Sequence, residues 1–127
     1  MKVLSLEQMN KLKELGVDVK PKGECLIYQI VMGIDIITLT DKFSNDDIKA
    51  FGLQDIIELL PPQLIHKEKN IYLNFENIGK EYGFYYVDCD FEIYIYFNNT
   101  NILQAAYNML LWVIENGYLK TKQNALI

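Results

Sequence analysis

The chain has 127 residues, a net charge of −5, and twelve lysines with no arginine. Half of its residues are hydrophobic, which is typical of a globular protein rather than a disordered one. Nucleic-acid sites gather lysine and arginine to replace counterions, and arginine makes most bidentate contacts to bases, so this composition argues against a nucleic-acid partner.

The length is that of one ordinary domain, and we expect a single α+β domain over residues 1–127. No apolar run approaches the ~18 residues of a membrane span, and the first residues lack the apolar core of a secretory signal, so no membrane partner is expected. The two cysteines, Cys25 and Cys89, are interpreted as buried thiols in a reducing compartment. The sequence therefore predicts a cytoplasmic protein.

The first half of the chain predicts a helix and a hairpin. Ser5 and Gln8 have the spacing of a capping box, and Gly16 suits the end of the helix that this box begins. A β-branched run then predicts strands at Glu24–Val31 and Asp35–Thr40, joined by a turn at residues 32–34. Because the run is apolar on both faces, we expect at least one of these strands to be covered on both sides.

The second half predicts a short helix, three strands and a long helix. Apolar residues at helical spacing over Leu53–Leu60 predict the short helix, which Pro61 ends. His66 lies in a polar stretch and is expected to be solvated, and residues 71–76 alternate as a half-buried strand. The last helix begins at Asn99 or Thr100 and ends before Gly117.

These elements follow the order α-ββ-α-βββ-α. We predict an α+β fold with a mostly antiparallel sheet of about five strands and helices packed against it.

Two segments carry a family resemblance. GLQDIIELLPPQL (Gly52–Leu64) and ILQAAYNMLLWVIENGYL (Ile102–Leu119) resemble a group of short uncharacterised proteins from prophages and mobile elements of Bacteroides-like gut bacteria. The resemblance implies a phage-related accessory protein and brings no assigned activity. Gly52, Gln104 and Asn108 replace a threonine, an aspartate and a glutamate of that group, so chemistry placed on those acids cannot be carried over.

The stretch YYVDCDFEIYIYF at residues 85–97 has two interpretations. As one strand it would place Asp88, Asp90 and Glu92 on one face at about 6.7 Å spacing, an arrangement that suits Ca²⁺ or Mg²⁺. Thirteen residues is long for a strand, however. As a hairpin it would form strands at 82–87 and 91–97, joined by the three-residue turn Asp88-Cys89-Asp90. We favour the hairpin, with a solvated turn and neither a metal nor another cofactor.

In that hairpin, odd positions would face the core and the even positions would form an aromatic surface. Aromatic residues form stabilising cross-strand pairs, and structural pairing is the favoured interpretation of this face. Because tyrosine and tryptophan are enriched at protein interfaces, self-association is the next candidate. In the last helix, Leu111 falls in the polar stripe and Trp112 lies on its border. The predicted interaction surface consists of Phe84, Tyr86, Tyr94, Tyr96, Leu111 and Trp112.

The inventory of catalytic residue types is small. There is one histidine, Ser5 and Ser44 are interpreted as helix caps, and no sequence feature brings Cys89 to His66. The leading hypothesis is a non-enzymatic protein-interaction or self-associating domain, with a homo-oligomer or another protein as its partner. One alternative is a small metal-dependent enzyme that uses Asp88, Asp90 and Glu92, and a nucleic-acid-associated protein ranks last.

Overall fold

The computed structural model describes residues 2–119, which form three helices and two antiparallel sheets. This confirms the predicted α+β class with a mostly antiparallel sheet. In chain order the elements are α1 (Leu6–Glu14), β1 (Cys25–Val31), β2 (Ile34–Thr40), β3 (Ile48–Lys49), α2 (Leu53–Leu59), β4 (Gln63–His66), β5 (Lys69–Ile78), β6 (Glu81–Val87), β7 (Ile93–Asn99) and α3 (Ile102–Glu115).

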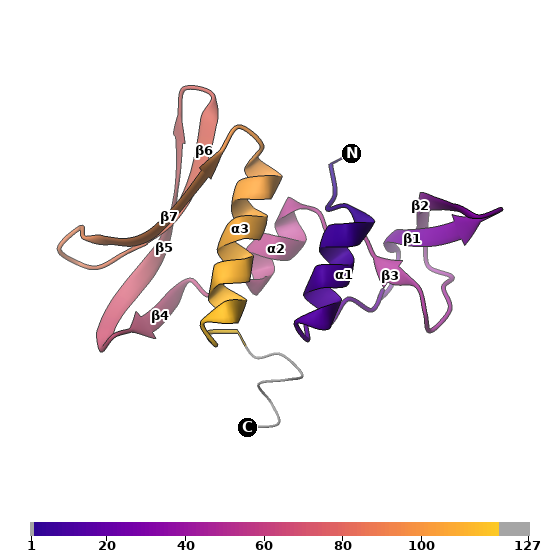
Figure 1. Cartoon of the computed structure of the whole chain (residues 1–127), viewed down its shortest axis with the longest axis horizontal. Helices are drawn as coiled ribbons and strands as arrows, with labels where there is room; N and C mark the ends of the chain where they lie inside the picture. Colours follow the sequence, from indigo (N-terminus) through magenta and orange to yellow (C-terminus); the bar gives the residue numbers. More distant parts are fainter. Residues whose placement is uncertain (1, 120–127) are drawn as a thin grey trace. The chain divides into compact units, whose positions relative to one another are not determined.

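The described chain divides into two compact units, residues 2–52 and residues 53–119. The first unit holds a sheet of order β2-β1-β3, and the second holds a sheet of order β4-β5-β6-β7. The predicted sheet of about five strands therefore omitted β3 and β4. The expected single domain stays a prediction, and each unit is described by itself (Figure 1).

The first unit begins with the predicted helix. The Ser5 hydroxyl accepts a hydrogen bond from the Gln8 amide at 3.1 Å, and the Gln8 side chain accepts one from the Ser5 amide at 2.9 Å. Gly16 has a φ of 92°, a value in the left-handed region that glycine adopts without steric cost. Both boundary predictions for this helix are confirmed.

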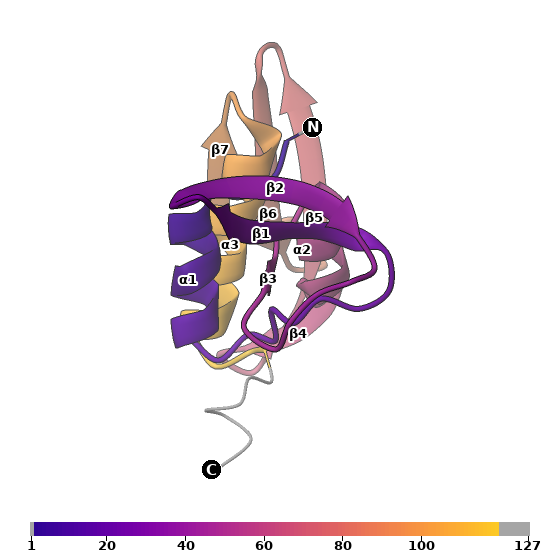
Figure 2. The same cartoon turned by 90° about the vertical axis from the view of Figure 1, so that its right-hand side faces the viewer.

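Strands β1 and β2 form the predicted hairpin. Val31 pairs with Ile34 next to the turn, and Cys25 pairs with Thr40 at the other end of the strands. The turn has two residues, Met32 and Gly33, rather than the predicted three, and their φ values are 52° and 79°. Positive φ at both positions is the geometry of a type I′ turn, which matches the twist of paired strands. In Figure 2 strand β2 runs along the outside of this sheet, and β1 lies between it and β3.

In the second unit α3 packs against one face of the sheet, along β6 and β7, and α2 packs against α3 (Figure 1). The cap of α3 is Asn101, whose side chain accepts hydrogen bonds from the amides of Leu103 and Gln104. The expected caps Asn99 and Thr100 were therefore wrong by one or two residues. Leu103, Ala105, Ala106, Met109, Leu110 and Val113 are the most deeply buried side chains of α3.

Strands β6 and β7 form the second predicted hairpin, but the predicted turn and register are wrong. The connection spans residues 88–92 rather than three residues, and Val87 pairs with Ile93 instead of Phe91. Between Val87 and Tyr86 the register shifts by one residue, so that Tyr94 is the extra residue of a β-bulge. Beyond the bulge Tyr85 pairs with Tyr96, an odd position with an even one.

This register changes which residues of β6 face the core. Phe84 and Tyr86, which we expected on the outer face, are 3% and 0% exposed. Phe91, which we expected to be buried, is 87% exposed. The interior also satisfies the polar atom of Tyr86, whose hydroxyl donates a hydrogen bond to the Pro61 carbonyl at 2.7 Å.

Strand β4 was missed because its turn carries no usual signal. It pairs with β5 through a hairpin whose two turn residues, Lys67 and Glu68, have φ values of 50° and 69°. Asparagine and glycine are the residues that announce such a turn, and neither occupies these positions.

Candidate functional site

Asp88 is the best-connected carboxylate of the second unit. One oxygen accepts hydrogen bonds from the amides of Asp90 at 2.9 Å and Glu92 at 3.0 Å, and the other accepts one from the Tyr94 hydroxyl at 3.1 Å. The Lys69 ammonium lies 3.9 Å from that second oxygen. The hydrogen bond from the Glu92 amide, with smaller contributions from the other donors and Lys69, lowers the pKa of Asp88. Asp88 therefore organises the β6–β7 connection.

The carboxylates of this connection do not gather into a metal site. Asp90 and Glu92 are exposed, and the oxygens of Asp88 are occupied by protein donors. Within residues 2–119, no three side chains from histidine, cysteine, aspartate and glutamate lie where they could hold a metal ion. The alternative of a metal-dependent enzyme on these three residues gains no geometric support.

His66 belongs to an aromatic cluster. It is half-buried, its Nδ1 forms a hydrogen bond with the Tyr118 hydroxyl, and its ring lies 5.5 Å from that of Trp112 and 6.1 Å from that of Tyr94. The prediction of a solvated histidine is therefore wrong. Trp112 also stacks near Tyr86, at 6.0 Å between ring centroids, so contacts with the sheet explain its place at the border of the helix pattern.

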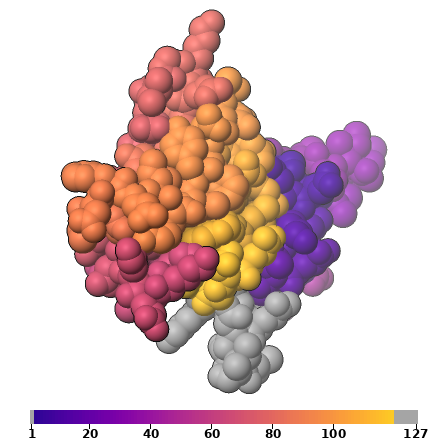
Figure 3. All heavy atoms as spheres, turned by 60° about the vertical axis from the view of Figure 1, so that its left-hand side comes forward, coloured from indigo at the N-terminus to yellow at the C-terminus, as the bar shows by residue number. Residues whose placement is uncertain are grey.

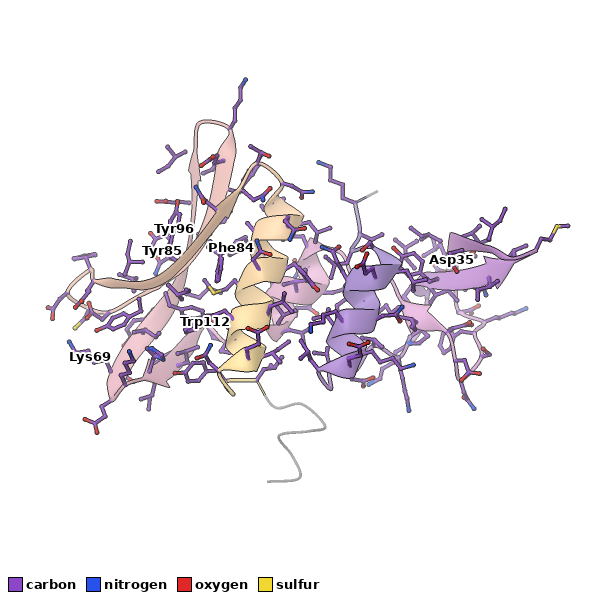
Figure 4. The ribbon with its side chains drawn as sticks, viewed as in Figure 1. Asp35, Lys69, Phe84, Tyr85, Tyr96 and Trp112 are labelled. Atoms are coloured by element: carbon purple, nitrogen blue, oxygen red, sulfur yellow. The ribbon has the colours of Figure 1, made fainter. Side chains whose placement is uncertain are left out.

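The six predicted surface residues do not form one surface. Phe84 and Tyr86 are in the interior and out of reach of a partner. Tyr94, Leu111 and Trp112 are half-buried, and Tyr96 lies on the opposite face of the sheet. Figure 4 shows Phe84 on the side of the sheet that faces α3, and Tyr85 and Tyr96 on the other side.

The outer face of the four-stranded sheet is aromatic and carries a shallow concavity. Tyr85 and Tyr96 lie 5.8 Å apart between ring centroids, and the Tyr96 hydroxyl donates to Glu76 at 2.5 Å. The concavity, of about 550 Å³, is open to solvent. Its lining residues are Tyr72, Asn74, Tyr85, Val87, Asp88, Cys89, Phe91 and Ile93. In Figure 3 the surface of β7, in orange, occupies much of the visible face of this unit, and the tip of the β5–β6 hairpin projects above it.

The structure does not bring Cys89 and His66 together as a nucleophile and its base. Cys89 is exposed and lines the concavity on the outer face, whereas His66 packs with Trp112 of α3. The other thiol, Cys25, is half-buried at the start of β1. The prediction that both thiols are buried is therefore wrong, most clearly for Cys89. Ser5 acts as a helix cap, as expected. The same prediction is wrong for Ser44, which begins a turn closed by a hydrogen bond from the Asp47 amide to its carbonyl.

The largest exposed apolar surface of the first unit is the β1–β2 hairpin. Seven of its aliphatic side chains are between 38% and 96% exposed: Ile30, Val31, Met32, Ile34, Ile36, Ile37 and Leu39. Both faces of β2 contribute, because Ile34 and Ile36 alternate with Ile37 and Leu39. The expectation that at least one strand would be covered on both sides is wrong for β2, and β1 is uncovered towards the turn.

The two edges of this sheet differ. On the β3 side, the Lys49 amide donates to the carbonyl of Val19 at 2.9 Å, so a neighbouring segment occupies that edge. On the other side, β2 is the outermost strand over seven residues. Natural edges are usually shortened, bulged, or marked with charged residues or proline; β2 carries one charge, Asp35, and none of the other features.

No known protein family, curated protein or solved structure matches this chain. The resemblance to prophage and mobile-element proteins therefore stays a prediction. None of the helices within residues 2–119 is long and apolar enough to cross a membrane.

Proposed function

We propose that this chain is a non-enzymatic, self-associating protein-interaction module. The observation that carries the proposal is the β1–β2 hairpin, which exposes aliphatic side chains on both faces of an open edge strand. Exposed apolar patches of this kind mark interaction sites, because leaving them in water costs free energy that a partner recovers. We extend the proposal to a cytoplasmic accessory protein of phage or mobile-element type, on the strength of the free cysteines and the resemblance of two helical segments.

The size of the patch suits a protein partner. At about 100 Å² for a fully exposed aliphatic side chain, the seven residues expose roughly 400 Å² of apolar surface. A standard interface buries ~800 Å² per partner, of which roughly 450 Å² is apolar. The hairpin therefore supplies about the apolar area that one side of a stable interface uses.

Two observations favour interaction over the other hypotheses. The most connected carboxylate, Asp88, is engaged by backbone amides, as expected for a structural residue. The net charge of −5 and the absence of arginine oppose binding to phosphate backbones.

The test is analytical ultracentrifugation of the whole protein over a concentration series. We expect the wild type to sediment as an oligomer and Leu39→Lys to weaken association at least tenfold, because burying a leucine contributes about 1.5–3 kcal/mol and a lysine at a strand edge opposes pairing.

Ile78→Lys is the matched control. Ile78 lies in the second unit and is 66% exposed, close to the 60% of Leu39, so it changes a similar side chain outside the hairpin. A wild type that stays monomeric at its highest soluble concentration would refute self-association. Weakening by Ile78→Lys alone would place the contact on the second unit.

A further inference from the structure

We infer that β2 pairs antiparallel with β2 of a second copy, around a two-fold axis at Ile37, so that the two three-stranded sheets join into one. This inference rests on the proposed self-association and names the strand, partner and register through which it occurs. It follows from which backbone groups of β2 are free, from the parity of its side chains and from the position of its one charge.

The backbone direction of β2 can be worked out from β1. The Ala50 amide donates to the Leu26 carbonyl at 2.8 Å, so the backbone groups of Leu26 point towards β3. Because alternate residues of an antiparallel strand point their hydrogen-bonding groups to opposite sides, the odd-numbered residues of β1 bond to β2. Their partners in β2 are the even-numbered residues, from Ile34 to Thr40.

The odd-numbered residues of β2 therefore point their amides and carbonyls out of the sheet. These residues are Asp35, Ile37 and Leu39, and within residues 2–119 no strand lies beside β2 on that side. Such a row of open donors and acceptors is a template for one more strand, which gains main-chain hydrogen bonds as it adds.

Side-chain parity restricts the register in which a second β2 can add. Residues directly opposite each other in an antiparallel pair project on the same face, and two-fold symmetry keeps the odd-numbered face of both copies on one side. Odd positions must then oppose odd ones. A pairing centred on Ile37 meets this condition, opposes Asp35 with Leu39 and Ile34 with Thr40, and uses the whole strand.

This register also separates the charges. Asp35 is the one charged residue of β2, and in the centred pairing the two aspartates lie four residue positions apart, roughly 13 Å along the sheet. Each faces an aliphatic leucine near the hydrated margin of the strand rather than the other carboxylate. A register shifted by two residues towards the turn would oppose Asp35 with Ile37 and leave Leu39 beyond the paired strand. The centred register therefore buries more apolar surface.

A second copy fits this edge better than an unrelated strand. The sequence IDIITLT places isoleucine on the axis and opposes the isoleucines at 34 and 36 with threonines at 40 and 38. These are pairs of β-branched residues, which pack well across strands. The strand is thus its own complement about Ile37, and no other segment is needed to complete the sheet.

The test is disulfide cross-linking by position, in chains where Cys25→Ala and Cys89→Ser remove the native thiols. Residues opposite each other in a hydrogen-bonded pair have Cα atoms ~5.5 Å apart, within the range that a disulfide spans. We expect Ile37→Cys to form a covalent dimer under mild oxidation at least tenfold faster than Ile36→Cys or Thr38→Cys alone. The latter two lie diagonally from their own copies, at about 7–8 Å.

Mixing two different cysteine variants determines the register of the pairing. Ile36→Cys chains that carry an affinity tag and untagged Thr38→Cys chains should cross-link to each other, because these positions are opposite in the centred pairing. Ultracentrifugation of the cysteine-free parent separates the possible failures. A monomeric parent refutes the proposed function itself, whereas an oligomeric parent without Ile37→Cys cross-linking refutes only this strand pairing.

Discussion

The two hairpins β1–β2 and β6–β7 are both rich in apolar residues and reach opposite environments. Strand β2 consists of isoleucine, leucine and threonine with one aspartate, has no bulge, and exposes both faces. Strand β7 alternates aromatic and aliphatic residues, carries a bulge at Tyr94, and is covered on one face by α3.

The difference lies in what each unit provides around its hairpin. The second unit has a fourteen-residue helix whose apolar face covers the sheet, together with an aspartate that fixes the β6–β7 connection. The edges of its sheet are a strand of four residues and a bulged strand, both of which oppose addition of another strand. The first unit leaves its seven-residue edge open. An apolar strand sequence therefore predicts that other residues will cover the strand. It does not indicate whether those residues belong to the same chain or to a partner.

The strongest test of this contrast is one substitution made in both regions. Leu110→Ala removes a side chain that is 0% exposed in α3, and we expect it to lower the free energy of unfolding by about 2–5 kcal/mol. Leu39→Ala removes the same atoms from β2, where they are 60% exposed, and should cost less than ~1 kcal/mol in the monomer. Urea denaturation at low protein concentration measures both.

Concentration separates the two effects further. The loss caused by Leu110→Ala should be the same at every protein concentration, whereas that caused by Leu39→Ala should grow as the wild type associates. Equal losses at low concentration would mean that β2 is covered within its own chain, and would remove the contrast between the hairpins.

The existence of both hairpins, and the boundaries of the first to within one residue, could be predicted because they depend on local chemistry. Gly33 marks the first turn, and the β-branched and aromatic runs mark the strands. The register of β6 and β7 could not, since it depends on a bulge at Tyr94 that no residue type announces. The buried position of Tyr86 depends on the Pro61 carbonyl, which comes from a distant part of the sequence. The missing cover of β2 is likewise a property of the assembled fold.

The β6–β7 connection predicts a pH dependence that the β1–β2 turn lacks. Amide donors lower the pKa of Asp88 below its ordinary value of 3.8, so its ionised form is favoured by folding. Its contribution to stability is therefore fully present above that value and is lost as the pH falls through the lower pKa of the folded state. Asp88→Asn should reduce the melting temperature by roughly 5 °C at pH 7, and the gap should narrow below pH ~4.

Asp90→Asn is the control for this experiment, because it removes an exposed carboxylate from the same connection. Melting curves between pH 7 and pH 3 should be nearly the same for this variant and the wild type. A constant gap between wild type and Asp88→Asn at all pH values would show that shape, rather than charge, is what the connection requires.

The aspartate was singled out from the sequence for the wrong reason. Three acidic residues in alternation suggested ligands for a cation, whereas one of them, Asp88, folds back onto the amides of Asp90 and Glu92. Aspartate is common in turns because of this ability, and the sequence contains that signal. The partner atoms could not be identified, because a three-residue turn and a five-residue turn place the amides differently.

The smallest expected effect concerns a third hairpin, β4–β5, which shares its turn geometry with β1–β2 and lacks its glycine. Glu68 has a φ of 69°, a conformation that costs a residue with a side chain about 1 kcal/mol, and Gly33 occupies the corresponding position of the first hairpin at 79°. Glu68→Gly should therefore raise the free energy of unfolding by about 0.5–1 kcal/mol, measured by urea denaturation. The reverse change, Gly33→Glu, should lower it by a similar amount, because nothing lies within 4 Å of a Cβ at Gly33 and backbone strain alone remains. If Glu68→Gly destabilised the protein, the second turn would depend on contacts of the glutamate side chain, and the likeness of the two turns would be limited to their backbone angles.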